Sequence, residues 1–142
     1  MNRLNIENLH EDRMIVEVTD DDSKITVTFK GDIDMEDPGM VLDPFFSTLH
    51  ERLLAQKIKE VNTDFKELNF LNSSGIKAVA KWIMKLGEVS EAERYTIHIQ
   101  YNRDITWQVT SLPTLNFLVP GVKKIQRFLK EASRKKNNAF GS

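Results

Sequence analysis

The sequence of 142 residues contains no cysteine, which excludes disulfide bridges, thiolate zinc sites and a cysteine nucleophile. Its start lacks the apolar stretch of a secretory signal, and no stretch approaches the roughly 20 apolar residues that a membrane helix requires. Hydrophobic residues nevertheless make up 40% of the chain, which is enough for one core of ordinary size. We therefore expect a soluble, cytoplasmic protein without a membrane partner.

An excess of charge of one sign is also missing. Twenty Lys and Arg residues stand against 21 Asp and Glu residues, so the formal net charge is −1 and no overall basic field indicates nucleic acid. The charges are unevenly distributed, because residues 1–22 hold seven acidic side chains and residues 121–142 hold seven basic ones. We interpret the basic run at 134–136 as part of a solvated tail and expect no nucleic-acid partner.

Sequence signatures of an enzyme or a cofactor site are scarce. The glycine-rich patterns GxxxxGK[ST] and GxGxxG, which bind phosphates, do not occur, and the three histidines are isolated. The acidic group Asp32, Asp34, Glu36 and Asp37 invites comparison with a calcium loop, but an EF-hand needs glycine at the sixth position, where Asp37 stands. We expect a solvated loop there, and we expect no catalytic activity, no cofactor and no metal site.

Hydrophobic periodicity predicts strands that alternate with helices. The predicted strands are 14–18, 25–29, 60–66, 95–101 and 122–128. The first predicted helix runs from 42 to about 57 or 59, and the second covers 76–87 and is closed by Gly87. A third helical segment covers 105–120, with a kink or restart near Ser111 because of Pro113. Residues 129–136 are expected to form a fraying basic helix or tail. This order indicates an α/β sandwich built from βαβ units.

The junction before the helix at 76–87 has the most chemical content. Asn72, Ser73, Ser74 and Gly75 follow a hydrophobic strand, and Asn and Ser at such a position cap the backbone N–H groups of the first helical turn. Glycine weakens the start of a helix by roughly 1 kcal/mol relative to alanine, so Gly75 indicates that another backbone or a bulky partner approaches closely. A phosphate on a serine here would lie at the favourable end of the helix dipole, which suits a phosphorylation switch.

Two segments in this order resemble the STAS domain, the fold of bacterial anti-sigma factor antagonists. The matching residues are Gly31, Asp32, Ile33 and Asp34 in one segment, and Asp64, Leu68, Phe70, Leu71, Asn72, Ser73, Ser74, Gly75 and Ile76 in the other. The resemblance implies a single α/β domain at 13–128, with a mixed sheet of four to five strands and helices mainly on one face. Residues 1–12 would be an N-terminal extension and residues 129–142 a basic C-terminal helix or tail. The segment 107–121 is similar to a subgroup of STAS-like bacterial regulators.

The resemblance also implies a function. In the family, a serine kinase of histidine-kinase-like fold, often itself the anti-sigma factor, binds the unphosphorylated domain and phosphorylates one serine, and a metal-dependent serine phosphatase reverses this. That serine corresponds to Ser73, with Ser74 as the alternative, while Asn72 replaces the acidic residue that usually precedes it. The expected partner-binding residues are Asp32, Asp34, Asn72, Ser73, Ser74, Gly75, Lys77, Ala78 and Trp82.

Alternatives remain open at this stage. The chain could be a scaffold in which Asn72 and Ser73 only cap the helix, or a module that binds a nucleotide or another anion at the helix N-terminus. Trp82 falls off the core stripe of its helix and could anchor an interface, or it could pack against the preceding helix. Trp107 is expected to cover the core rather than to contact a partner.

Overall fold

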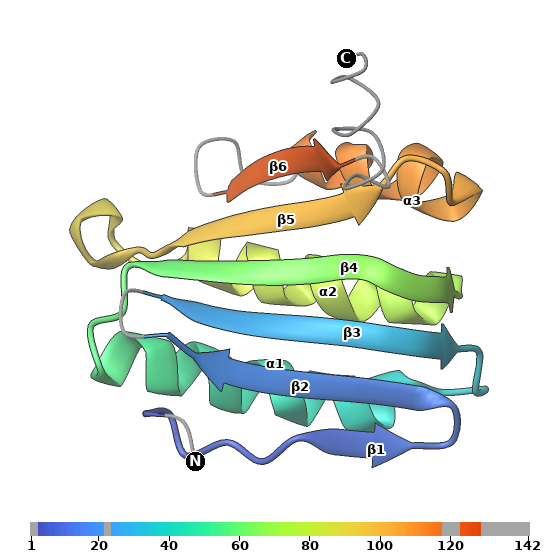
Figure 1. Ribbon diagram of the computed structural model, residues 1–142. Helices are drawn as coiled ribbons and strands as arrows, with labels where there is room; N and C mark the ends of the chain where they lie inside the picture. Colours follow the sequence, from blue (N-terminus) through green and yellow to red (C-terminus); the bar gives the residue numbers. More distant parts are fainter. Residues whose placement is uncertain (1–2, 22–23, 118–122, 129–142) are drawn as a thin grey trace.

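The computed structural model describes residues 3–21, 24–117 and 123–128. The strands lie in one sheet in the order of the sequence (Figure 1). They are β1 (Leu9–Glu11), β2 (Met14–Asp20), β3 (Ile25–Ile33), β4 (Glu60–Leu71), β5 (Thr96–Asn102) and β6 (Lys123–Phe128). The pairs β1–β2 and β2–β3 are antiparallel, whereas β3 to β6 are parallel, so the sheet is mixed.

Helices connect the parallel strands. The long helices α1 (Gly39–Ala55) and α2 (Ser73–Gly87) follow β3 and β4 and lie side by side on one face of the sheet (Figure 1). The connection from β5 to β6 contains α3 (Thr106–Ser111) and the 3₁₀ helix η2 (Leu112–Phe117), and a further 3₁₀ turn, η1 (Glu91–Glu93), precedes β5. The predicted α/β architecture, with helices mainly on one face, is confirmed.

Most predicted elements occur where the periodicity placed them. The change from α3 to η2 comes at residues 111 and 112, next to Pro113, which lacks an N–H and cannot continue an α-helical ladder. Strand β4 is five residues longer than predicted because irregularities in its pairing with β3 interrupt the alternation after Asp64. Strand β1 was not predicted, since three residues carry no detectable period, and the sheet therefore has six strands rather than four to five. The predicted tail at 129–136 lies outside the described residues.

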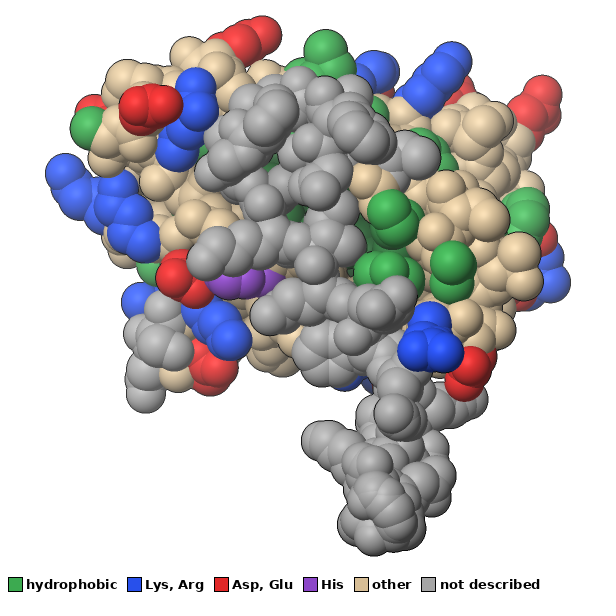
Figure 2. All heavy atoms as spheres, turned by 90° about the horizontal axis from the view of Figure 1, so that it is seen from above, with side chains coloured by type: hydrophobic (Ala, Val, Ile, Leu, Met, Phe, Trp, Pro, Cys, Tyr) green, Lys and Arg blue, Asp and Glu red, His purple; other side chains and the backbone are tan. Residues whose placement is uncertain are grey.

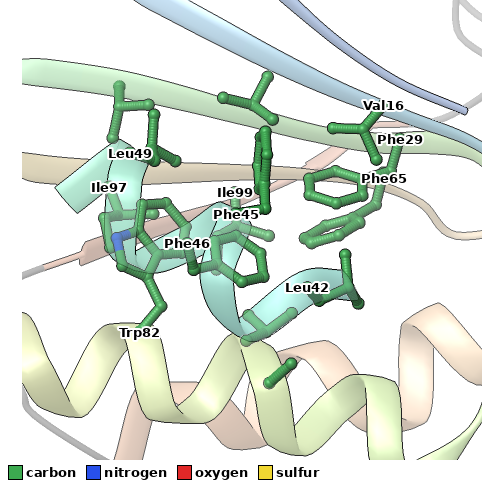
Figure 3. Close-up of a cluster of buried hydrophobic side chains, with 14 of the residues drawn as sticks. Val16, Phe29, Leu42, Phe45, Phe46, Leu49, Phe65, Trp82, Ile97 and Ile99 are labelled. Atoms are coloured by element: carbon green, nitrogen blue, oxygen red, sulfur yellow. The ribbon is translucent and has the colours of Figure 1, made fainter. Parts of the chain in front are cut away.

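Aromatic rings join the sheet to both long helices (Figure 3). Phe29 of β3 stacks on Phe65 of β4 with ring centroids 5.0 Å apart, and on Phe46 of α1 at 6.0 Å. Phe46 in turn stacks on Trp82 of α2 at 4.8 Å with an interplanar angle of 15°. Offset stacks of this kind add about 0.5–1.5 kcal/mol each beyond area burial, so the chain of rings fixes the spacing of sheet, α1 and α2.

A hydrogen-bonded group of three side chains lies within this core. The Trp82 indole N–H donates to the Tyr95 hydroxyl oxygen at 2.8 Å, and the same hydroxyl lies 2.7 Å from His50 Nδ1. The indole N–H can only donate, so the Tyr95 oxygen accepts from Trp82. The hydroxyl proton of Tyr95 can then be donated to Nδ1 of a neutral His50. Burial, with a smaller contribution from the positive charge of Lys85, lowers the pKa of His50 below 6.5, which favours this neutral form.

Gly31 allows β2 and β3 to approach closely at the end of their hairpin. Its φ is +89°, and a Cβ there would lie 2.0 Å from the backbone carbonyl oxygen of Arg13.

We predict that Gly31→Ala lowers the free energy of unfolding by roughly 2–4 kcal/mol in urea titrations, because both the positive φ and the contact with Arg13 oppose a side chain. Gly39→Ala is the matched control, since a Cβ at Gly39 meets Asp43 Oδ2 only at 3.4 Å. Equal effects of the two substitutions would contradict the argument.

We predict that acidification destabilises the protein through His50. The pKa of His50 is lower in the folded than in the unfolded chain, so below pH 6.5 the unfolded chain binds more protons. The stability that neutral His50 contributes is therefore complete above pH 6.5 and is lost as the pH falls below that value. The free energy of unfolding, measured by urea titration from pH 7.5 to 5, should fall less steeply in His50→Gln than in the wild type. His10→Gln, which changes an exposed histidine of β1 outside this group, is the control for the substitution itself.

Candidate functional site

The candidate site is the β4–α2 junction, where Asn72 caps the helix. Asn72 has an extended backbone, with φ −77° and ψ 174°, and its Oδ1 accepts a hydrogen bond of 2.9 Å from the N–H of Gly75. The predicted N-cap is therefore confirmed for Asn72. Ser73 and Ser74 are the first two helical residues, so capping by Asn72 leaves their hydroxyls available for another role.

Asn72 also holds the loop between β3 and α1. Its Nδ2 donates to the carbonyl oxygen of Met35 at 2.9 Å, and its backbone N–H donates to the carbonyl of Ile33 at 3.1 Å. An aspartate could accept from Gly75 in the same way but could not donate to Met35, because an ionised carboxylate has no proton. STAS-domain antagonists usually have an acidic residue at this position. Asn72, which replaces it here, connects the β3–α1 loop to the start of α2 through the hydrogen bond to Met35.

Gly75 is explained by packing inside the chain. A Cβ on Gly75 would lie 2.3 Å from Leu71 Cδ1 and 3.2 Å from Leu71 Cγ, and Leu71 is itself buried. The close approach is therefore made by a side chain of β4, and not by another backbone or a partner as the sequence indicated. This contact brings the end of β4 directly under the first turn of α2.

The two serines differ in exposure. Ser73 is exposed and Ser74 is half-buried, and the Ser73 hydroxyl has no hydrogen bond to any other residue that the structure describes. Lys77, one turn further along α2, is also exposed. An enzyme could therefore reach Ser73 without moving the surrounding backbone, and an added phosphate would have a cation one helical turn away.

Asp32 and Asp34 face a cation of the same chain. Arg13 forms an ion pair with Asp34, and its guanidinium lies 3.7 Å from an oxygen of Asp32. Within the described residues, no group of three or more acidic or histidine side chains has a geometry that would hold a metal ion. The contact with Arg13 was missed because it joins the β1–β2 turn to the end of β3, and no local spacing in the sequence encodes it.

Of the two alternatives for Trp82, packing against the preceding helix is confirmed, so its assignment to the partner-binding residues is corrected. Trp82 is 2% exposed and lies against Phe46; Ala78, also expected to bind a partner, is likewise 2% exposed. The helical projection failed because it considered only the stripe that faces the sheet, whereas α1 covers a second stripe of α2. Trp107 covers the core as expected: it packs on Phe65 and donates its indole N–H to the Leu68 carbonyl at 3.1 Å.

Charges on the face seen in Figure 2 are mixed rather than separated. Figure 2, which views the molecule from above relative to Figure 1, shows Lys and Arg side chains interspersed with Asp and Glu around the described part of that face. The arrangement agrees with the formal net charge of −1. Among the described residues, the structure contains no helix that is long and apolar enough to span a membrane.

No family model and no curated protein matches the sequence, but solved structures match the fold. An anti-sigma factor antagonist from Mycobacterium paratuberculosis is 21% identical, with a TM-score of 0.55 over 78% of this chain and 85% of that one. SiaC of Pseudomonas aeruginosa is 20% identical, with a TM-score of 0.59 over 86% and 99%. The fold is STAS-like.

A third similar structure is that of the diguanylate cyclase SiaD in complex with its activator SiaC from Pseudomonas aeruginosa. The matching chain is 17% identical, with a TM-score of 0.64 over 85% of this chain and 98% of that one. The STAS-like fold is thus shared by proteins whose names connect them with different partner proteins.

We predict that Asn72→Asp lowers the free energy of unfolding by about 1 kcal/mol, because the hydrogen bond to Met35 is lost while the cap on Gly75 is kept. Hydrogen exchange should show faster exchange in the β3–α1 loop and an unchanged Gly75 amide. Asn69→Asp, at an exposed position of β4, is the control for the added charge. Identical stabilities of the two variants would show that the Met35 contact contributes nothing.

Proposed function

We propose that this chain is a phosphorylation-controlled protein-interaction switch in which the Ser73 hydroxyl accepts the phosphate. The observation that carries the proposal is the state of Ser73: it is exposed, it occupies the first position of a 15-residue helix, and Asn72 already performs the capping. The unphosphorylated surface around this serine would bind a protein partner, and the chain itself would not be a catalyst.

The physical basis of the switch is a local change of charge. A phosphoserine carries about −1.5 to −2 charges at neutral pH, and the N-terminus of a helix favours a negative charge. Modification therefore costs little in folding free energy. It would, however, place a dianion at the centre of the proposed interface, which opposes docking unless the partner supplies cations.

Protein partners are supported by the similar structures. One of them is named an anti-sigma factor antagonist, and another is SiaC, the activator of a diguanylate cyclase. For this chain we propose, from the resemblance in its motifs, a serine kinase of histidine-kinase-like fold or an anti-sigma factor as the partner. A metal-dependent serine phosphatase would restore the unphosphorylated form, in the cytoplasm of a bacterium.

The alternatives receive less support from the geometry. The scaffold alternative, in which Asn72 and Ser73 only cap the helix, agrees with the cap by Asn72 but assigns no role to the exposed Ser73 hydroxyl. Nucleotide sites are concave pockets that bury most of the ligand surface, whereas the hollow that Ser74 lines is open to solvent.

We predict that incubation with the cognate kinase and ATP adds one phosphate at Ser73, which peptide mass spectrometry would locate. Ser73→Ala should abolish the modification and Ser74→Ala should retain it, while both variants keep the wild-type free energy of unfolding within about 0.5 kcal/mol. Ser73→Glu should weaken binding of the partner about tenfold or more. Modification of neither serine would refute the switch, and full partner affinity of Ser73→Glu would refute its electrostatic mechanism.

A further inference from the structure

A groove runs between α1 and α2 and begins beside the candidate site. It consists of two adjoining hollows of about 260 Å³ and about 220 Å³, which share Asp43, Ala78 and Lys81 as lining residues. Ser74 lines the first hollow, so one end of the groove lies next to the serine pair. We call this feature, centred on Asp43, Ala78 and Lys81, the α1–α2 groove.

The groove has an apolar floor and an exposed apolar residue near one end. Phe46 and Trp82, which stack on each other, line the second hollow together with Ala78. Met40 lines the first hollow and is 73% exposed. Among the exposed large hydrophobic residues whose side chains are described, this is the highest exposed fraction. Such an exposed methionine gains from being covered, because its flexible thioether adapts to a partner surface.

Three lysines follow the groove along α2, and they outnumber the two acidic residues that line it, Asp37 and Asp43. Lys77, Lys81 and Lys85 are four residues apart, so they lie on one side of the helix over about 12 Å at a rise of 1.5 Å per residue. Lys81 reaches across to Asp43 at 3.1 Å and Lys85 to Ser47 Oγ at 3.1 Å. Lys81 is 67% exposed at its side chain, and exposed ion pairs contribute only about 0–1 kcal/mol, so these lysines can turn to other carboxylates.

We infer that the α1–α2 groove binds an acidic amphipathic segment of a protein partner. Apolar side chains of that segment would cover the exposed Met40, and its carboxylates would pair with Lys77, Lys81 and Lys85. Apolar anchors in a groove with charges of opposite sign along the rim are the usual components of such recognition. A second copy of this chain is a poorer occupant, because symmetric docking would place the two lysine rows against each other.

The inference rests on the proposed function, because it supplies the partner whose binding the phosphate would control. Ser73 lies four residues before Lys77, the spacing at which helical side chains meet. A phosphate on Ser73 would attract Lys77 and add negative charge at the end of the groove. An acidic segment would then lose Lys77 as a pairing partner and would be repelled by the phosphate at the same end of the groove. Phosphorylation of Ser73 would therefore oppose binding of the segment.

The test uses a phage-displayed library of random 16-residue peptides selected against the full chain. Selected peptides should be rich in Asp, Glu and large apolar residues, and their affinity should fall with added salt. The variant Lys77→Glu, Lys81→Glu, Lys85→Glu should weaken their binding about tenfold or more. Lys57→Glu, Lys59→Glu, Arg103→Glu is the charge-matched control outside the groove and should bind normally. In a Trp107→Phe background, peptide binding should change the fluorescence of Trp82 on the groove floor.

Each other outcome counts against the inference. Selection of basic or uncharged peptides, failure to select any, or equal weakening by both triple variants would overturn it, as would peptide binding that requires dimerisation in sedimentation analysis. Ser73→Glu separates the two proposals. If the selected peptides lose affinity on reversal of the groove lysines but not in Ser73→Glu, the groove stands and its control by a charge at Ser73 fails. If Ser73→Glu alone weakens binding, the switch stands and the groove assignment fails.

Discussion

The position of Phe46 between the sheet and Trp82 is the contact on which the functional face depends. Its ring stacks on Phe29 of β3 and on Trp82 of α2, so one side chain of α1 sets the distance of both long helices from the sheet. The Tyr95 hydroxyl completes this arrangement by binding the Trp82 indole and His50 at once. Because protein interiors are close-packed, displacement of any of these rings would move α2 and the groove beside it.

Asn72 has the corresponding role at the serine pair. One oxygen caps α2 and one amide nitrogen holds the β3–α1 loop, so two segments distant in sequence meet at a single side chain. The serines are thereby presented on a surface whose backbone is already hydrogen-bonded. This preorganisation would keep the cost of binding a partner low, since little conformational freedom is left to lose there.

Much of the fold and part of the site could be predicted from local pattern. Alternating residues such as those of β2 and β5 show which face is buried, and Asn72 before a helical stripe predicts its cap. Trp82 could not be placed in this way. Its burial depends on α1, which lies beside α2 only after both helices have packed on the sheet. The same reason hid the contact of Arg13 with Asp34 and that of Asn72 with Met35.

The sequence by itself determined the alternation of strands and helices, the helix start at the serines, and a resemblance to STAS domains, because these depend on spacings of a few residues. Only the tertiary structure decided that the Ser73 hydroxyl is exposed, that Leu71 occupies the space beside Gly75, and that Lys77 belongs to a row along an α1–α2 groove. Exposure and neighbourhood are properties of surfaces that come together from distant segments. Their energies depend on packing, which no local periodicity records.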